Sequence, residues 1–200
     1  DPSLADFRGV SDRFGSAEFL LLTWQPASDL LSEESLEPLA ALADELRTLE
    51  GVRSVVTVLD VPLLESPPLS LSDVTSGTGL PTLSDPAVDR GLALTELTTS
   101  PIYSELLASQ DGRMTAVQVN LEPFEAYDRA ISRRESLRLL AESSALSQAQ
   151  QQELIDLAQL IKASSAEAME TRSTLVAEVR QLADKYRQDA DIFVGGVPMI

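Results

Sequence analysis

The main candidates in this sequence for catalysis or for binding a metal are acidic side chains. There are 32 Asp and Glu residues but no histidine and no cysteine. The Ser/His/Asp and Cys/His arrangements of nucleophilic catalysis therefore cannot form, and neither can a zinc site with Cys or His ligands. Carboxylates alone could still hydrolyse glycosides or bind calcium or magnesium. Residues 73–79 (DVTSGTG), however, lack the alternating acids of a calcium loop and the lysine of a phosphate-binding loop. We expect no enzyme activity, no catalytic residues, no metal and no cofactor.

Four aromatic side chains are the best candidates for binding a ligand. Trp24, Tyr103, Phe124 and Tyr127 could line a groove for a fused-ring or acyl molecule, because aromatic faces offer apolar area and the polar tips can hold a hydroxyl. The alternative for each is an ordinary place in the core. If the groove exists, Trp24→Ala or Tyr127→Ala will weaken ligand binding without unfolding the domain, and unchanged affinity in both variants would refute it.

Two glycines and a proline interrupt the apolar run at the end of the chain, residues 192–200. Gly195, Gly196 and Pro198 are candidates for a hinge that transmits motion between a membrane part and this domain. The alternative is a bulge or a close backbone approach in an edge strand.

The net charge and hydrophobicity of the chain limit the classes of partner and the kind of protein that we expect. A formal net charge of −17 would repel phosphate backbones, so nucleic acid is not an expected partner. No stretch approaches the roughly 20 continuous apolar residues of a transmembrane helix, and the N-terminus does not look like a signal peptide. The 44% of hydrophobic residues is enough for a packed core. The sequence therefore predicts a soluble, folded domain.

The first elements follow a strand, helix, strand order over residues 19–59. The apolar run 19–24 predicts a buried strand, and the β-branched run 52–59 predicts another. Between them Ser32 is suited to begin a helix and Gly51 to end it. Residues 62–104 are rich in Pro, Ser, Thr and Asp and predict a large insertion without regular periodicity.

A hairpin, two helices and a last strand are expected over residues 105–200. Asp111-Gly112 separates two strand-like runs and predicts a hairpin turn. The first helix follows Pro123, and a capping box at Ser147 begins a second that would extend to about Arg187. A helix of that span measures about 60 Å, so part of it must project or break, with 164–165 as the softest point. Its apolar stripe could form a coiled coil, but packing on the sheet is the preferred interpretation.

These elements together predict one α+β domain over residues 1–200. Its strand and helix order is that of a ferredoxin-like split βαβ pair, with a large insertion and an extended helical segment.

Five short stretches carry a resemblance to a known family: 13–18 (RFGSAE), 49–55 (LEGVRSV), 100–103 (SPIY), 109–116 (SQDGRMTA) and 195–200 (GGVPMI). In this order they resemble the first extracytoplasmic loop of the resistance-nodulation-division superfamily. The branch they resemble contains the mycobacterial-type (MMPL) lipid exporters and the hopanoid and sterol transporters of Gram-negative bacteria.

The resemblance implies a porter-type fold on the periplasmic side of an inner-membrane transporter. The chain would then be the part between two transmembrane helices, with the proton-coupling residues outside it. The implied partners are an apolar lipid such as a sterol or hopanoid and a periplasmic carrier, with a homodimer or trimer left open. The alternative function is a docking or oligomerisation module that binds no substrate.

Overall fold

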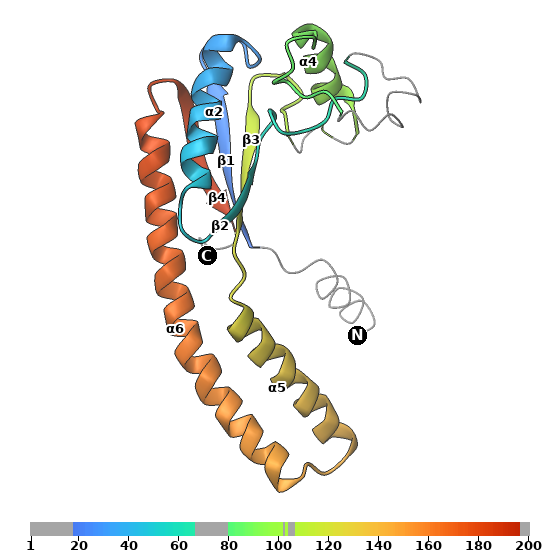
Figure 1. The fold of residues 1–200 in the computed structure, drawn as a ribbon, viewed down its shortest axis with the longest axis vertical. Coiled ribbons are helices and arrows are strands. Elements are labelled where there is room, and N and C mark those ends of the chain that lie inside the picture. The colour runs from blue at the N-terminus through green and yellow to red at the C-terminus, as the bar shows by residue number, and fades with distance from the viewer. Residues whose placement is uncertain (1–17, 67–79, 102, 104–106, 197–200) are drawn as a thin grey trace.

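The computed structural model describes residues 18–66, 80–101, 103 and 107–196, and these parts of the chain form four strands and four helices. The predicted α+β class is confirmed. Figure 1 shows the sheet with α2 and part of α6 beside it, α4 near one end of the sheet, and a pair of helices that extends beyond the other end.

The sheet is antiparallel throughout, in the order β2-β3-β1-β4. The central strands are β1 (Phe19–Pro26) and β3 (Thr115–Leu121), and the edges are β2 (Val52–Val56) and β4 (Ala190–Gly196). Every second side chain of β1 and of β3 is buried, as expected for strands with one face on a core. Since β3 runs against both β1 and β2, these two strands are parallel to each other.

The helix α2 (Glu33–Arg47) begins as predicted at Ser32, whose hydroxyl accepts a hydrogen bond from the Ser35 amide. It ends earlier than predicted. Its C-cap is Thr48, and Gly51 instead has a φ of +84° in the turn that leads into β2. The strand β2 is also shorter than the predicted 52–59, because the Asp60 carboxylate bonds the amide and hydroxyl of Thr57 and closes a turn there.

The insertion contains a helix that the sequence pattern did not predict, α4 (Arg90–Thr99). Asp89 caps it by accepting from the Gly91 and Leu92 amides, and Ala93 and Leu97 bury one face. The buried Glu96 carboxylate accepts hydrogen bonds from the Leu64 and Glu65 amides at 2.6 and 3.0 Å. These bonds attach the start of the insertion to its only helix among the described residues. Residues 67–79 lie outside the described part.

The turn at Asp111-Gly112 has the predicted tight form. The Gly112 amide bonds the Ser109 carbonyl at 2.9 Å, and Gly112 has a φ of +66°. The strand that follows this turn is β3. In the described residues before the turn, only Ala108 pairs with β3, through a single bridge to Thr115.

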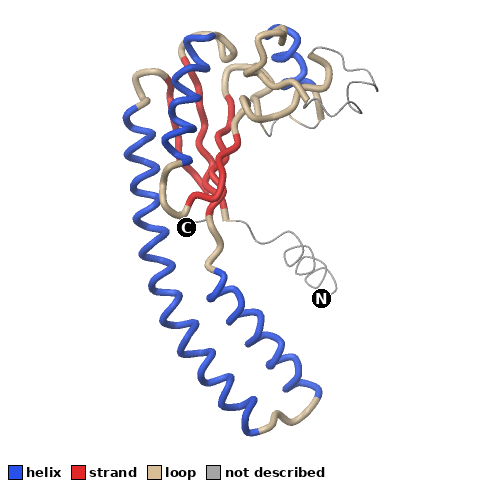
Figure 2. The backbone as a smooth tube through the Cα atoms, viewed as in Figure 1, coloured by secondary structure: helices blue, strands red, loops and turns tan. Residues whose placement is uncertain are grey.

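The second half of the chain is dominated by α5 (Glu125–Ser143) and α6 (Gln148–Lys185), which begins with the predicted capping box between Ser147 and Gln150. The predicted break at 164–165 is wrong, because α6 is continuous and contains no Gly or Pro that would kink it. The predicted projection is confirmed. Figure 2 shows the first part of α6 lying beside α5, beyond the sheet. We call residues 125–172 the arm.

The hydrophobic core lies between one face of the sheet and helices α2 and α6. It includes Leu22 and Trp24 of β1, Leu39 of α2, and Leu175 and Val179 of α6. None of its buried residues comes from the arm. The other face of the sheet carries Leu21 and Phe193, both exposed. The core therefore holds α6 only from Leu175 onward.

The C-terminal end of α6 is fixed to α2. Glu45 accepts hydrogen bonds from the Lys185 ammonium at 2.5 Å and from the Tyr186 hydroxyl at 2.9 Å. Burial, together with the hydrogen bond to Glu45, raises the pKa of Tyr186 to about 12. The Tyr186 hydroxyl therefore stays protonated and continues to donate this bond at physiological pH.

Trp24 and Phe193 test the assignment of the two sheet faces. Trp24 is 0% exposed and Phe193 is 67% exposed. We expect Trp24→Ala to lower the free energy of unfolding by about 3–5 kcal/mol, because it leaves a core cavity. Phe193→Ala is the matched control and should change it by less than about 0.5 kcal/mol. Urea unfolding followed by circular dichroism measures both, and equal losses would contradict the assignment.

Candidate functional site

Arg172 is the centre of a polar cluster at the point where α6 leaves the sheet. Its Nε lies 2.7 Å from the Glu18 carboxylate, which precedes β1. Its Nη2 donates to the Glu122 carbonyl at 2.6 Å, and its guanidinium lies 4.6 Å from the centroid of the Phe124 ring. The side chain is 11% exposed, so these charged contacts are screened less than on an open surface. Arg172 thereby connects the arm to both central strands.

The connector 122–124 brings these groups together. The Glu122 amide donates to the Gly51 carbonyl at 2.8 Å, and Pro123, which has no N–H, cannot extend the β3 ladder. Phe124 is the N-cap residue of α5, and no side-chain hydrogen bond caps the helix there. Its ring is half-buried beneath Arg172, which holds the first turn of α5 close to α6.

Acidic groups gather around the same point. Partial burial raises the pKa of Asp128, the nearby Glu18 carboxylate raises it further, and Arg172 opposes both effects. Two carboxylates thus share a single close cation. The contacts of Arg172 with Glu18, the Glu122 carbonyl and Phe124 hold two structural parts together.

A cavity of about 790 Å³ lies against this cluster. Phe124 and Tyr127 line it together with Arg53, Glu122, Pro123, Glu125, Ala126, Ser164 and Glu167. Its volume is in the range of small-molecule sites. Three glutamates and one arginine give it a net negative lining, which suits an amphipathic or cationic molecule better than a purely apolar one.

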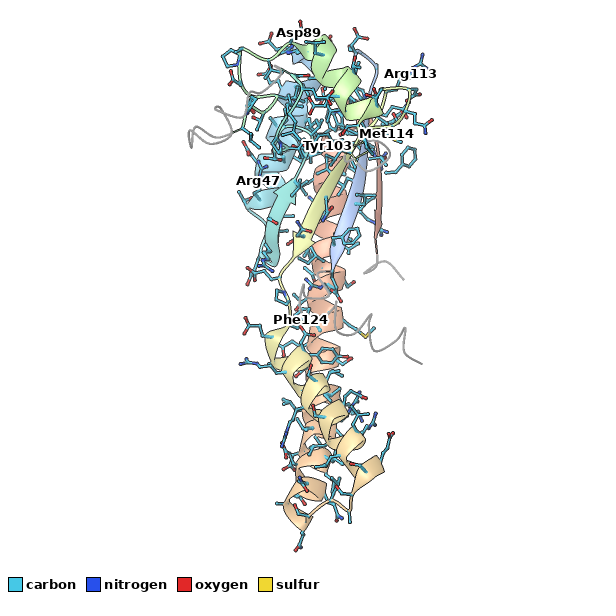
Figure 3. The ribbon with its side chains drawn as sticks, turned by 90° about the vertical axis from the view of Figure 1, so that its right-hand side faces the viewer. Arg47, Asp89, Tyr103, Arg113, Met114 and Phe124 are labelled. Atoms are coloured by element: carbon cyan, nitrogen blue, oxygen red, sulfur yellow. The ribbon has the colours of Figure 1, made fainter. Side chains whose placement is uncertain are left out.

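The structure brings together only two of the four predicted aromatic residues, Phe124 and Tyr127. Trp24 is a fully buried core residue opposite Thr115. Tyr103 is also buried, and its hydroxyl donates to the Pro62 carbonyl at 2.5 Å, while burial and Glu96 raise its pKa. Figure 3 shows Tyr103 near one end of the sheet and Phe124 beyond the other. The seven residues of β3 extend about 24 Å between these two ends. Trp24 and Tyr103 therefore do not line this cavity.

Two of the three predicted hinge residues, Gly195 and Gly196, lie on the edge strand β4. Gly196 pairs with Leu20 at a φ of +136°, and a Cβ there would lie 2.6 Å from the Phe19 carbonyl oxygen. Gly195 has ordinary space around it. A close backbone approach therefore explains Gly196. Pro198 lies outside the described residues.

A second cavity, of about 930 Å³, lies at the other end of the sheet. Three turns and Leu94 line it, and they supply Asp29, Asp111, Asp189, Asp191, Arg113 and Arg187. The Ser109 hydroxyl and the Arg113 amide lower the pKa of Asp111 by hydrogen bonding to it. In the described chain, no three acidic side chains are close enough to hold a metal ion.

The prediction from sequence missed Arg172, although the sequence carries a signal for it. Arg172 lies three residues before Leu175 and four after Ala168, within the apolar stripe of α6. A single charge in an apolar stripe calls for a specific partner, because burial without one is costly. The partners, Glu18 and the Glu122 carbonyl, are far away in sequence and could not be identified from it.

Comparisons of this chain with protein-family models, curated proteins and solved structures found no match. In the described segments, no helix has both the length and the hydrophobicity needed to cross a bilayer. The family resemblance of the sequence motifs therefore stays a prediction.

Asp128 makes the stability of the junction depend on pH. Because its pKa is raised above the usual 3.8, the folded chain binds this proton more tightly than the unfolded chain does. Its contribution to stability is present below pH 3.8 and is lost as the pH rises through the raised value. Asp128→Asn should therefore raise the melting temperature at pH 7 and have little effect at pH 3.

Thermal unfolding of the two proteins across this pH range measures the effect. Asp29→Asn, at an exposed position far from Arg172, is the control and should have no such pH-dependent gain. A melting temperature of Asp128→Asn equal to or below that of the wild type at pH 7 would contradict the assigned environment.

Proposed function

We propose that this domain is a docking module of a membrane transporter, and that it binds a partner protein through the arm. The observation that carries the proposal is the sparse burial of the arm. Among its residues only Ala130, Leu137 and Ile161 are buried. A pair of helices with so few buried side chains gains little stability from its own packing, since most helix stability in proteins comes from tertiary contacts.

The same arm exposes much apolar surface. Five of the ten large apolar residues that are exposed in the described chain lie on it: Leu139, Leu140, Ile155, Leu160 and Met169. Exposed apolar side chains in this number on one projecting element favour a contact with another protein. None of these five side chains lines either of the two cavities described above, so a partner that buries them must cover them from outside.

The strand order supports a porter-type domain. In β2-β3-β1-β4, each of the pairs β1/β2 and β3/β4 is parallel and separated by one antiparallel strand, as in a ferredoxin-like split βαβ pair. This is the fold that the resemblance to the resistance-nodulation-division superfamily implies. We therefore propose a periplasmic position on an inner-membrane transporter of a Gram-negative bacterium.

A second candidate function is the binding and transfer of a lipid, such as a sterol or hopanoid, toward a periplasmic carrier. The cavity beneath Phe124 and Tyr127 favours it, because two aromatic faces there offer apolar area. Its glutamate-rich lining favours it less. Native mass spectrometry after incubation with a bacterial lipid extract would support this function if one lipid class stays bound and is lost in Tyr127→Ala.

Site-specific photo-crosslinking tests the docking function. A benzoylphenylalanine residue replaces Ile155 on the arm or, as a control, the equally exposed Leu92 on α4. We expect specific crosslinked products from the arm position in the cells that make the protein, identified by mass spectrometry, and none of these from the α4 position. The same products from both positions, or none from the arm, would contradict the proposal.

A further inference from the structure

We infer that the arm docks onto the arm of a second copy of this chain. This inference rests on the proposed docking function and names its partner. It begins from two stripes on α6. Leu154, Leu157 and Ile161 form the stripe that faces α5, and each is buried or half-buried. A different stripe, formed by Ile155, Lys162 and Met169, lies along the flank of the helix.

The flank stripe has the spacing of a coiled-coil seam. Ile155, Lys162 and Met169 are seven residues apart, and Ala158 and Ser165 lie between them at the alternating three-and-four spacing. Ile155 is 53% and Met169 is 72% exposed, and Lys162 is exposed between them, whereas Ser165 is half-buried. The described chain therefore leaves most of this stripe uncovered. The small side chains at 158 and 165 allow a second helix to approach closely. The shape therefore suits another helix.

The charge distribution favours the arm of a second copy of this chain as the source of that helix. The arm contains eight acidic and six basic residues, a net charge of −2, whereas the rest of the chain contains 24 acidic and nine basic residues, a net charge of −15. Two copies would repel each other through any other large surface. A strongly basic partner would be drawn to the acidic remainder and not to the arm. The arm is thus where two copies can meet at the lowest electrostatic cost.

Lys162 sets a limit on the strength of the contact. A charged residue at one central seam position specifies register and oligomeric state but lowers stability. The stripe from Ile155 to Met169 is also only about 21 Å long, which is short for a permanent interface. We therefore expect reversible association with a dissociation constant on the order of 100 µM.

Sedimentation equilibrium of the purified full chain tests the inference. The wild type should associate reversibly, and more strongly at about 0.5 M than at about 0.05 M NaCl, because salt screens the repulsion between the acidic remainders. Ile155→Asp combined with Met169→Asp should weaken association at least about tenfold. Lys162→Leu should strengthen it about tenfold. Phe193→Asp, on the open sheet face, is the matched control for an exposed apolar residue and should change nothing.

Disulfide trapping gives a second measurement that does not depend on the folding of the charged variants. The chain has no cysteine, so Ile155→Cys and Met169→Cys each introduce a single thiol. Under mild oxidation we expect crosslinked dimers from Ile155→Cys alone if the arms are parallel, or from a mixture of the two variants if they are antiparallel. Phe193→Cys should crosslink no more than random collision allows.

The inference is overturned if the wild type and Lys162→Leu both stay monomeric at millimolar concentration, or if Phe193→Asp and not the arm variants abolishes association. Monomers here combined with photo-crosslinks from Ile155 to a different protein would overturn self-association and leave the docking function standing. If there is neither self-association nor any specific photo-crosslink from Ile155, both the self-association and the docking function are overturned.

Discussion

The length of α6 is the constraint on which the rest of the structure depends. Its 38 residues extend about 57 Å, whereas a seven-residue strand of the sheet extends about 24 Å. A helix that packs along the sheet must therefore leave it. The core takes the part from Leu175 onward, and the remainder is long enough to need a partner of its own, which α5 supplies. One helix thus belongs both to the core and to the arm, and whatever acts on the arm acts on a rigid extension of the core.

Polar contacts fix both ends of the part of α6 that packs on the sheet. At one end Arg172 binds Glu18 and the Glu122 carbonyl, and at the other Lys185 and Tyr186 bind Glu45. Since Glu18 precedes β1 and Glu122 follows β3, the first contact sets the direction in which the arm leaves the sheet. At this junction, partial desolvation and the nearby Glu18 carboxylate both raise the pKa of Asp128, so the ionised form of Asp128 is disfavoured there. The junction therefore fixes direction at some cost in stability.

Local patterns in the sequence predicted what depends on local chemistry. The strand that begins at Phe19, the helix start at Ser32 and the capping box at Ser147 are confirmed, because each involves residues close in sequence. Contacts between distant segments could not be predicted. Trp24 and Phe193 are both aromatic strand residues, and only their opposite directions in the sheet make one buried and the other exposed. The helix α4 was missed because Asp89, Ala93 and Leu97 lie in a segment dominated by residues that favour turns. The predicted groove of four aromatic residues could not be tested against the sequence for the same reason. Spacing along the chain does not reveal that Tyr103 and Phe124 lie at opposite ends of β3.

The position of the apolar surface, more than its amount, separates the two candidate functions. Binding a lipid requires a concave apolar site that encloses most of the molecule. The two cavities described above lie at the ends of the sheet and have charged residues in their linings, whereas Ile155, Leu160 and Met169 are exposed on the arm and line neither cavity. Exposed apolar groups leave water only when a second surface covers them. Within this part of the chain, the surface with most to gain from burial therefore belongs to the arm, and the partner that buries it must be at least as extended as a helix.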